Sequence, residues 1–277
     1  MNTRNRVAIV TGAGRGLGRT MALGLLNHGL SVVAVDRDRE PLAELMQSVP
    51  DLKARLATLA QDLTTADAAE NVEHAALDAF GRIDILVNNA GMGQSVLWPD
   101  HWNNPLRFWD IELDQWKKFF EINTHAMFMM SRMAVAHMAP ARWGRIINVT
   151  TSLGSMLRAG FAPYGASKAA AESLSRIMAA ELANTGVTVN VLTPGGLTNT
   201  AANPGAPFDR AKMIQPEVML PPLRWLVSDD SSATTGRRFV ATRWDTSLAP
   251  GDAAAKCASP AAWSDEGSKP VEPERIA

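Results

Sequence analysis

The chain has 277 residues, of which 46% are hydrophobic and 20% are charged, and its formal net charge is −1. This composition is typical of a folded globular protein, gives no basic surface for nucleic acid, and contains no apolar run near the roughly 20 residues of a membrane span. Cys257 is the only cysteine, which excludes an intramolecular disulfide and a cysteine-rich zinc site and favours a reducing cytoplasm.

The first predicted elements form one βαβ unit: a strand over 7–10, a glycine turn, a helix over 19–29 and a strand over 31–35. Further apolar, β-branched runs lie at 56–60, 83–87, 145–149 and 187–192, and helical stretches lie at 40–48, 66–80, 113–138 and 164–184. Continuous apolar strands that alternate with helices indicate a parallel sheet covered on both faces. We therefore predict a single-domain, doubly wound α/β sheet of the Rossmann type, with three layers (αβα), over residues 1–250.

Three segments fall outside this alternation. Residues 93–116 hold Trp98, Trp102, Trp109 and Trp116 together with Phe108, which indicates either core packing under a long loop or the wall of a substrate pocket. Residues 198–222 are rich in proline and are expected to form a second substrate loop, a lid over the sheet edge. Residues 251–277 are rich in Ala, Ser, Pro and charge, which predicts a weakly ordered C-terminal tail.

The glycine turn predicts a dinucleotide site. Gly12, Gly16 and Gly18 stand between a predicted strand and a predicted helix, where glycines let backbone N–H groups approach a pyrophosphate. Asp36 ends the second strand, and a carboxylate there accepts the ribose hydroxyls and repels a 2′-phosphate, which favours NAD over NADP. Arg15 and Arg37 argue against a preference for NAD, because either could attract a 2′-phosphate. The alternative is that each arginine is only a solvated surface charge.

A tyrosine and a lysine form the predicted catalytic pair. Tyr164, the only tyrosine, and Lys168 are four residues apart in a predicted helix, so that their side chains share one face. A neighbouring ammonium is expected to lower the pKa of the phenol. The phenolate then takes a proton from an alcohol while the cofactor accepts a hydride, and the phenol returns it in reduction. The alternative is a purely structural role, with a buried tyrosine beside an unrelated lysine.

These motifs, in this order, resemble the short-chain dehydrogenase/reductase family over residues 7–241. The resemblance implies that Tyr164 and Lys168 also contact the cofactor, that Asp62 reads the adenine amino group, and that oligomers form, as a dimer or tetramer through the helices at 113–138 and 164–184. It further implies cofactor-binding roles for Leu17, Leu63, Asn89, Ala90, Gly91, Pro194, Gly195, Leu197 and Thr198. The family's threonine after the proline is replaced by Asn199, so that Thr198 or Thr200 is expected to substitute.

The resemblance also implies a hydroxyl that holds the substrate oxygen. Counting thirteen residues back from Tyr164 gives Thr151, whereas residue type favours its neighbour Ser152. Both residues therefore remain candidates. Only one is expected to face the site, because successive strand residues face opposite sides of the sheet. Asn123 matches the family asparagine that holds a water in a proton relay, and its alternative is an ordinary buried amide.

The sequence therefore predicts an NAD-dependent oxidoreductase that interconverts a secondary alcohol and a ketone. The alternatives are an NADP-dependent 3-oxoacyl-type reductase and a non-catalytic dinucleotide-binding sensor or scaffold. No histidines stand at metal-ligand spacing, so no metal is expected. The substrate stays open among sugars, steroids and short acids, and Arg107, Arg158 and Arg210 are candidates for binding a carboxylate.

Overall fold

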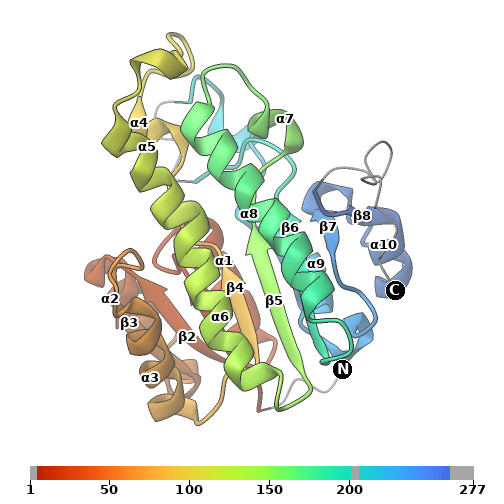
Figure 1. Ribbon diagram of the computed structural model, residues 1–277. Helices are drawn as coiled ribbons and strands as arrows, with labels where there is room; N and C mark the ends of the chain where they lie inside the picture. Colours follow the sequence, from red (N-terminus) through yellow and green to blue (C-terminus); the bar gives the residue numbers. More distant parts are fainter. Residues whose placement is uncertain (1–4, 201–205, 263–277) are drawn as a thin grey trace, which may run out of the picture.

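The computed structural model describes residues 5–200 and 206–262, in which strands and helices alternate along the chain (Figure 1). The strands are β1 (Val7–Thr11), β2 (Ser31–Asp36), β3 (Leu56–Ala60), β4 (Ile85–Asn88), β5 (Gly144–Val149), β6 (Val187–Thr193), β7 (Arg237–Val240) and β8 (Ala258–Pro260). The helices are α1 (Gly16–Asn27), α2 (Arg39–Gln47), α3 (Ala68–Phe80), α4 (Gln94–Leu97), α5 (Leu113–Phe120), α6 (Ala126–Met138), α7 (Leu153–Met156), α8 (Ala162–Glu181), α9 (Leu220–Leu226) and α10 (Pro250–Cys257). Every predicted strand and helix is present, with ends shifted by a few residues.

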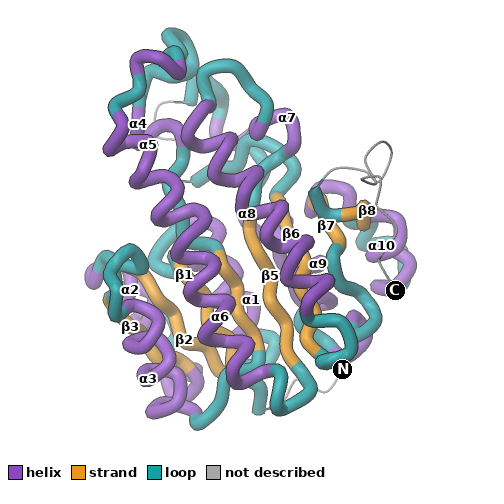
Figure 2. The backbone as a smooth tube through the Cα atoms, in the orientation of Figure 1, coloured by secondary structure: helices purple, strands orange, loops and turns teal. Residues whose placement is uncertain are grey.

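The strands form one eight-stranded sheet in the order β3-β2-β1-β4-β5-β6-β7-β8. β1 to β7 are parallel, and β8 runs antiparallel to β7. Helices lie on both sides of the sheet (Figure 2), so the predicted doubly wound Rossmann-type fold is confirmed. The chain reverses its direction of travel across the sheet between β1 and β4, and this point at the carboxyl ends is where such sheets bind ligands.

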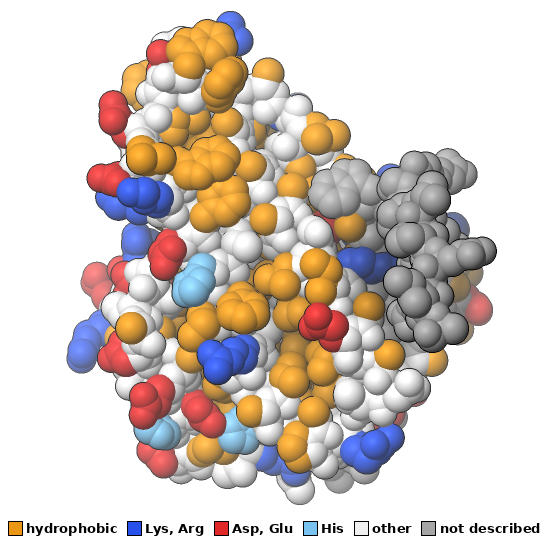
Figure 3. All heavy atoms as spheres, in the orientation of Figure 1, with side chains coloured by type: hydrophobic (Ala, Val, Ile, Leu, Met, Phe, Trp, Pro, Cys, Tyr) orange, Lys and Arg blue, Asp and Glu red, His pale blue; other side chains and the backbone are white. Residues whose placement is uncertain are grey.

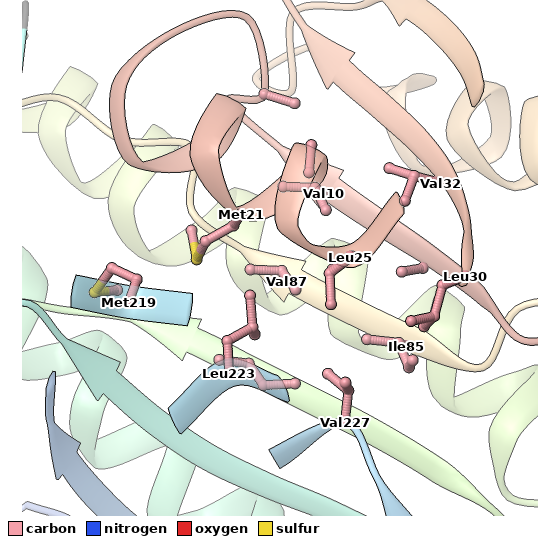
Figure 4. Close-up of a cluster of buried hydrophobic side chains, with 14 of the residues drawn as sticks. Val10, Met21, Leu25, Leu30, Val32, Ile85, Val87, Met219, Leu223 and Val227 are labelled. Atoms are coloured by element: carbon pink, nitrogen blue, oxygen red, sulfur yellow. The ribbon is translucent and has the colours of Figure 1, made fainter. Parts of the chain in front are cut away.

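Side chains alternate between the two faces of each strand and build two cores. In β1, Ala8 and Val10 pack with α1, α2, α9 and α10, whereas Val7 and Ile9 pack with α3, α6 and α8. Figure 4 shows part of the first core, to which both Val10 of β1 and Leu223 of α9 belong although they are far apart in the chain. Burial on both faces explains why these strands read as continuous apolar runs.

The prediction of a weakly ordered tail is wrong over residues 251–262. This segment forms α10 and β8, and Ala253, Ala254 and Cys257 are buried against the sheet. The short strand β8 forms because it pairs with β7 and so becomes the edge strand of the sheet. Residues 263–277, the rest of the predicted tail, lie outside the described residues.

Two other segments depart from the prediction. The helix expected over 113–138 is α5 and α6 joined by one π-helical turn, Glu121–His125. The proline-rich segment 198–222, expected as a lid, includes 201–205, which lie outside the described residues, and it ends in the first turn of α9, where Pro221 and Pro222 are tolerated. In the part of the chain that the structure describes, no helix is long and apolar enough to cross a membrane.

Candidate active site

A cleft of about 1380 Å³ lies along the carboxyl ends of the parallel strands. The predicted site residues that line it are Gly12, Arg15, Gly16, Leu17, Asp36, Arg37, Asp62, Leu63, Asn89, Ala90, Gly91, Thr151, Ser152, Tyr164, Lys168, Pro194, Leu197 and Thr198. Gly18, Asn123 and Gly195 are not in its lining. The topology therefore brings the turn after β1, the tyrosine helix and the loop after β6 to one place.

The glycine turn after β1 has no room for side chains. Gly12 and Gly16 have φ of 63° and 53°, and a Cβ on Gly18 would stand 1.9 Å from the carbonyl oxygen of Gly12. Helix α1 begins at Gly16, and its first turn holds no acidic residue. Its first backbone N–H groups and the positive end of its dipole thus face the cleft, as binding a pyrophosphate requires.

Two aspartates follow β2. Asp36 accepts hydrogen bonds from the backbone N–H of Gly14 at 2.9 Å and of Asp38 at 3.2 Å, which fixes its carboxylate beside the glycine turn. Asp38 pairs with Arg15 at 2.8 Å and with Arg37 at 3.6 Å. The two arginines that could attract a 2′-phosphate are therefore both engaged by a carboxylate.

Asp62 and Asn89 also line the cleft, and hydrogen bonds hold both side chains in place. The carboxylate of Asp62 accepts the backbone N–H and the hydroxyl of Thr64, at 2.9 and 2.7 Å, and these bonds lower its pKa. The side-chain amide of Asn89 donates to the carbonyls of Thr11 and Gly12, at 3.0 and 3.1 Å. Asn89 thereby ties the end of β4 to the glycine turn.

Tyr164, Lys168 and Thr151 meet in the middle of the cleft. Tyr164 and Lys168 lie one turn apart on α8, and the Lys168 ammonium donates to the carbonyl of Val149 at 3.1 Å. The prediction that Tyr164 has a lowered pKa is wrong here, because burial raises the pKa of its phenol, and a hydrogen bond from Thr151 only partly opposes this rise. Burial also lowers the pKa of Lys168 to about 8, which weakens the charge expected to act on the phenol.

The two candidate hydroxyls have different partners. The Thr151 hydroxyl lies near the phenol of Tyr164 and favours the phenolate, which lowers the pKa against the larger effect of burial. The Oγ of Ser152 accepts the backbone N–H of Ser155 at 3.1 Å, and the two serine hydroxyls are 2.8 Å apart, so that Ser152 caps the start of α7. Register in the sequence pointed to Thr151 and residue type to Ser152, and it is Thr151 that reaches the tyrosine.

Asn123 lies in the π-helical turn and is buried. Its Oδ1 accepts the backbone N–H of Met92 at 2.8 Å, while its Nδ2 donates to the carbonyl of Met92 at 3.1 Å and to the Ser167 hydroxyl at 3.0 Å. A second cavity, of about 10 Å³, lies between Asn123 and Lys168 and is lined also by Ala90. That volume suits one water molecule.

The loop after β6 forms another part of the cleft wall. Gly195 has φ of 105°, and a Cβ there would meet the hydroxyl of Thr242 at 2.1 Å, so it shapes the loop rather than lining the cleft. Thr198 and Thr200 both line the cleft. Asn199 instead donates to Gln215 at 3.0 Å and accepts from Arg210 at 2.9 Å, which agrees with the expected substitution by a neighbouring threonine.

A buried ion pair behind Thr151 went unpredicted. Arg238 on β7 pairs with Glu172 on α8, and its Nη2 donates to the carbonyl of Thr151 at 2.5 Å. Glu172 also accepts the Thr150 hydroxyl at 2.9 Å and the backbone N–H of Ala262 at 3.1 Å. The signal for Glu172 was present, since it follows Tyr164 and Lys168 by one further turn on the same helix face.

The aromatic residues of the tryptophan-rich segment 93–116 lie in different environments. Trp102 lines the cleft, which bears out the pocket-wall alternative for that residue. Phe108 and Trp109 are 69% and 67% exposed, so neither core packing nor a pocket explains them. Gln94 and His101 also line the cleft and went unpredicted, because a lone polar residue in a loop carries no spacing signal. Within the described residues, no cluster of His, Cys, Asp and Glu could hold a metal ion.

Comparison with known proteins agrees with this geometry. Residues 6–207 match the short chain dehydrogenase family. The chain is 33% identical to a 3-oxoacyl-[acyl-carrier-protein] reductase of Synechocystis sp., over 84% of the chain and 94% of that protein.

Two solved structures have similar folds. A 3-ketoacyl-(acyl-carrier-protein) reductase from Brucella melitensis, complexed with NADH, superposes with a TM-score of 0.74 at 26% identity, over 84% of this chain and 95% of that one. A short chain dehydrogenase from Shigella flexneri, complexed with NADP, gives a TM-score of 0.76 at 26% identity, over 86% and 98%.

The chain belongs to the short-chain dehydrogenase/reductase family. It is accordingly an oxidoreductase that binds a dinucleotide cofactor and acts on a hydroxyl or keto group of a small molecule. The alternative of a non-catalytic sensor or scaffold is not supported, because the sequence and the cleft keep the family's tyrosine and lysine together.

Proposed function

We propose that this enzyme uses NAD to interconvert a secondary alcohol and a ketone, with Tyr164 as the general acid and base. The observation that carries the proposal is that Tyr164, Lys168 and Thr151 line the same cleft as the Asp36 carboxylate. Two hydroxyl groups that meet there can hold one substrate oxygen between them, which fixes the carbon that reacts.

The chain's own residues provide the proton transfer. Bound NAD would supply the hydride acceptor and, when oxidised, a positive charge in the cleft. The alcohol gives its hydroxyl proton to the phenolate of Tyr164 as its C–H bond yields the hydride, and the ketone remains. Thr151 donates to the substrate oxygen, and Ser152 stays the helix cap. Because burial raises the pKa of Tyr164, the positive charges of Lys168 and of the cofactor are what favour the phenolate.

The proton is passed on through the neighbourhood of Lys168. The small cavity between Lys168 and Asn123 has room for one water, and the π-helical turn around Asn123 breaks the regular ladder of backbone hydrogen bonds. We assign Asn123 the role of holding Met92 and Ser167 so that this water can link the lysine to solvent. In this arrangement the asparagine positions the relay.

The proposed preference for NAD rests on charge after β2. Asp36 is held beside the glycine turn, where we expect the adenosine ribose to bind. Asp38 forms ion pairs with both Arg15 and Arg37. A 2′-phosphate would meet two carboxylates and no unengaged arginine. Titration with NADH and NADPH, followed by nucleotide fluorescence, tests this. We expect at least tenfold tighter binding of NADH, and a preference for NADPH would overturn the proposal.

A second candidate is an NADP-dependent 3-oxoacyl-type reductase. It is favoured by the similarity to the Synechocystis 3-oxoacyl reductase, and the Shigella structure shows that NADP occurs among similar folds. Turnover of acetoacetyl thioesters with NADPH, but not of simple secondary alcohols with NAD, would select this candidate. The control is Tyr164→Phe, which should abolish both reactions.

Assembly and location complete the proposal. Apolar side chains gather over α5, α6 and α8 (Figure 3), where Leu113, Phe128 and Ile177 are 65%, 42% and 50% exposed. We propose that these helices form a dimer or tetramer interface, which light scattering after size exclusion would test. We also place the enzyme in the cytoplasm, where the buried free thiol of Cys257 would stay reduced, and cell fractionation is the check.

A further inference from the structure

We propose that the substrate is a planar, apolar hydroxy or oxo acid, whose carboxylate is bound by Arg158 and whose planar group lies against the aromatic side chains beside Tyr164. This inference rests on the proposed function, since it names the substrate class of the same site. Three independent observations carry it: a continuous wall of rings, a guanidinium held on that wall, and polar atoms there that lack partners.

The aromatic wall consists of Phe161, His101, Trp102 and Phe208, and it starts at the reacting phenol. The ring centroids of Tyr164 and Phe161 are 6.1 Å apart, and those of Phe161 and His101 are 5.6 Å apart. His101 and Trp102 follow at 4.7 Å, and Trp102 and Phe208 at 5.5 Å. A wall of ring faces and edges that lines the cleft favours a flat apolar group.

Arg158 brings a positive charge to this wall. Its guanidinium carbon lies 5.2 Å from the ring centroid of Trp102 and 5.0 Å from that of Phe161, and the residue lines the cleft. Stacking on two rings restrains the guanidinium and leaves its N–H groups for an in-plane acceptor. Arg158 makes no ion pair with any residue between 5 and 200 or between 206 and 262, unlike Arg15 and Arg37. A ligand carboxylate matches this arrangement in shape and charge.

The rest of the wall does not cancel this charge. His101 places its Nδ1 3.0 Å from the carbonyl of Trp98. Burial, and to a smaller extent the charge of Arg158, lower the pKa of this ring against the effect of that hydrogen bond, which favours the neutral form. Asp209 and Lys212 also line the cleft and have opposite charges, which offset each other, so Arg158 keeps a positive charge beside the rings.

Trp102 and Gln94, which both line the cleft, each have a buried polar atom without a hydrogen-bond partner in the described part of the chain. The indole N–H of Trp102 and the Oε1 of Gln94 are buried without a hydrogen bond to any described residue. The amide orientation of Gln94 is fixed, because its Nε2 donates to the carbonyl of Gly160 at 2.8 Å, so Oε1 must be an acceptor. Unpartnered buried groups are rare in native structures, so a bound ligand or an ordered water on this side of the cleft would account for both.

The test uses benzoate and its neutral counterpart benzamide as probes. Each is titrated by calorimetry into the full chain, both alone and with saturating NADH. We expect benzoate to bind at least tenfold more tightly than benzamide, and Arg158→Gln to remove this preference while leaving benzamide binding unchanged. Arg107→Gln is the matched control, since Arg107 is exposed and does not line the cleft.

The outcomes separate the two proposals. Equal binding of benzoate and benzamide, or a preference that survives Arg158→Gln or is lost in Arg107→Gln, would overturn the inference. Arg158 is exposed, so its variant should keep the fold, and circular dichroism verifies this. Failure of NADH to bind would count against the proposed function alone, because the titration without nucleotide reports on Arg158 by itself.

Discussion

The ion pair between Arg238 and Glu172 offers the sharpest test of how the catalytic centre is held. Both residues are nearly inaccessible, at 3% and 1% exposure, and they join β7 to the tyrosine helix α8. Arg238→Met keeps most of the side-chain volume but leaves the Glu172 carboxylate buried without its counter-charge. Removing one partner of a buried pair typically costs about 3–5 kcal/mol of folding free energy.

The structure places the loss at the lower end of that range. Glu172 would keep the Thr150 hydroxyl at 2.9 Å and the Ala262 N–H at 3.1 Å, so we expect a loss of about 3 kcal/mol. Adding Glu172→Gln removes the buried charge, and its single amide oxygen keeps an acceptor for one of the two donors, the Thr150 hydroxyl or the Ala262 N–H. The double variant should therefore be more stable than Arg238→Met by about 1–2 kcal/mol.

Equilibrium unfolding in urea, followed by circular dichroism at one protein concentration, measures these values. Arg237→Met is the matched control, because Arg237 is the neighbouring arginine on β7 and forms no ion pair among the residues described; it should cost less than about 1 kcal/mol. The reasoning is refuted if Arg238→Met is no worse than this control, or if the effects of Arg238→Met and Glu172→Gln simply add.

The remaining predictions concern the tyrosine, the lysine and the glycine turn. Tyr164→Phe should lower kcat by about 10²–10⁴-fold with NADH binding unchanged, as stopped-flow and fluorescence titration would show, and a smaller loss would contradict its role. Because burial lowers the pKa of Lys168 to about 8, the unfolded chain binds more protons at this lysine between pH 8 and its ordinary value near 10.5. The titration of Lys168 therefore makes the free energy of unfolding rise between pH 8 and 9.5, by up to about 1.4 kcal/mol per pH unit. Urea unfolding measures this slope, and Lys168→Met should remove it. Gly18→Ala should abolish NADH binding, because a Cβ would stand 1.9 Å from the Gly12 carbonyl, whereas Gly251→Ala, with no atom within 4 Å, should leave NADH binding intact.

The sheet could be predicted from sequence wherever strands are buried on both faces. Such strands read as apolar runs, and the strand before Gly12 was recognisable also from the turn that follows it. β7 and β8 were missed because Arg238 and the short run Ala258–Pro260 carry no apolar pattern of their own. Those strands exist because α10 and the edge of β6 bury them, which is a property of the tertiary structure.

The candidate site also contains residues that could be predicted from the sequence and residues that could not. Tyr164 and Lys168 were predictable because helical spacing alone puts them on one face. The choice between Thr151 and Ser152 was not, since adjacent residues at a strand end differ only in which side they face. The charge behind Thr151 comes from Arg238, which is distant in sequence and arrives through the pairing of Val191 with Arg238 between β6 and β7.

The C-terminal segment has a consequence for biosynthesis. Domains generally fold as units, and the core around β1 already includes residues of α9 and α10, which are made late in synthesis. Glu172 likewise receives two of its three partners from Arg238 and Ala262, near the end of the described chain. Thr151 is therefore anchored only when synthesis is almost complete. Turnover of substrate would therefore require the chain through Ala262.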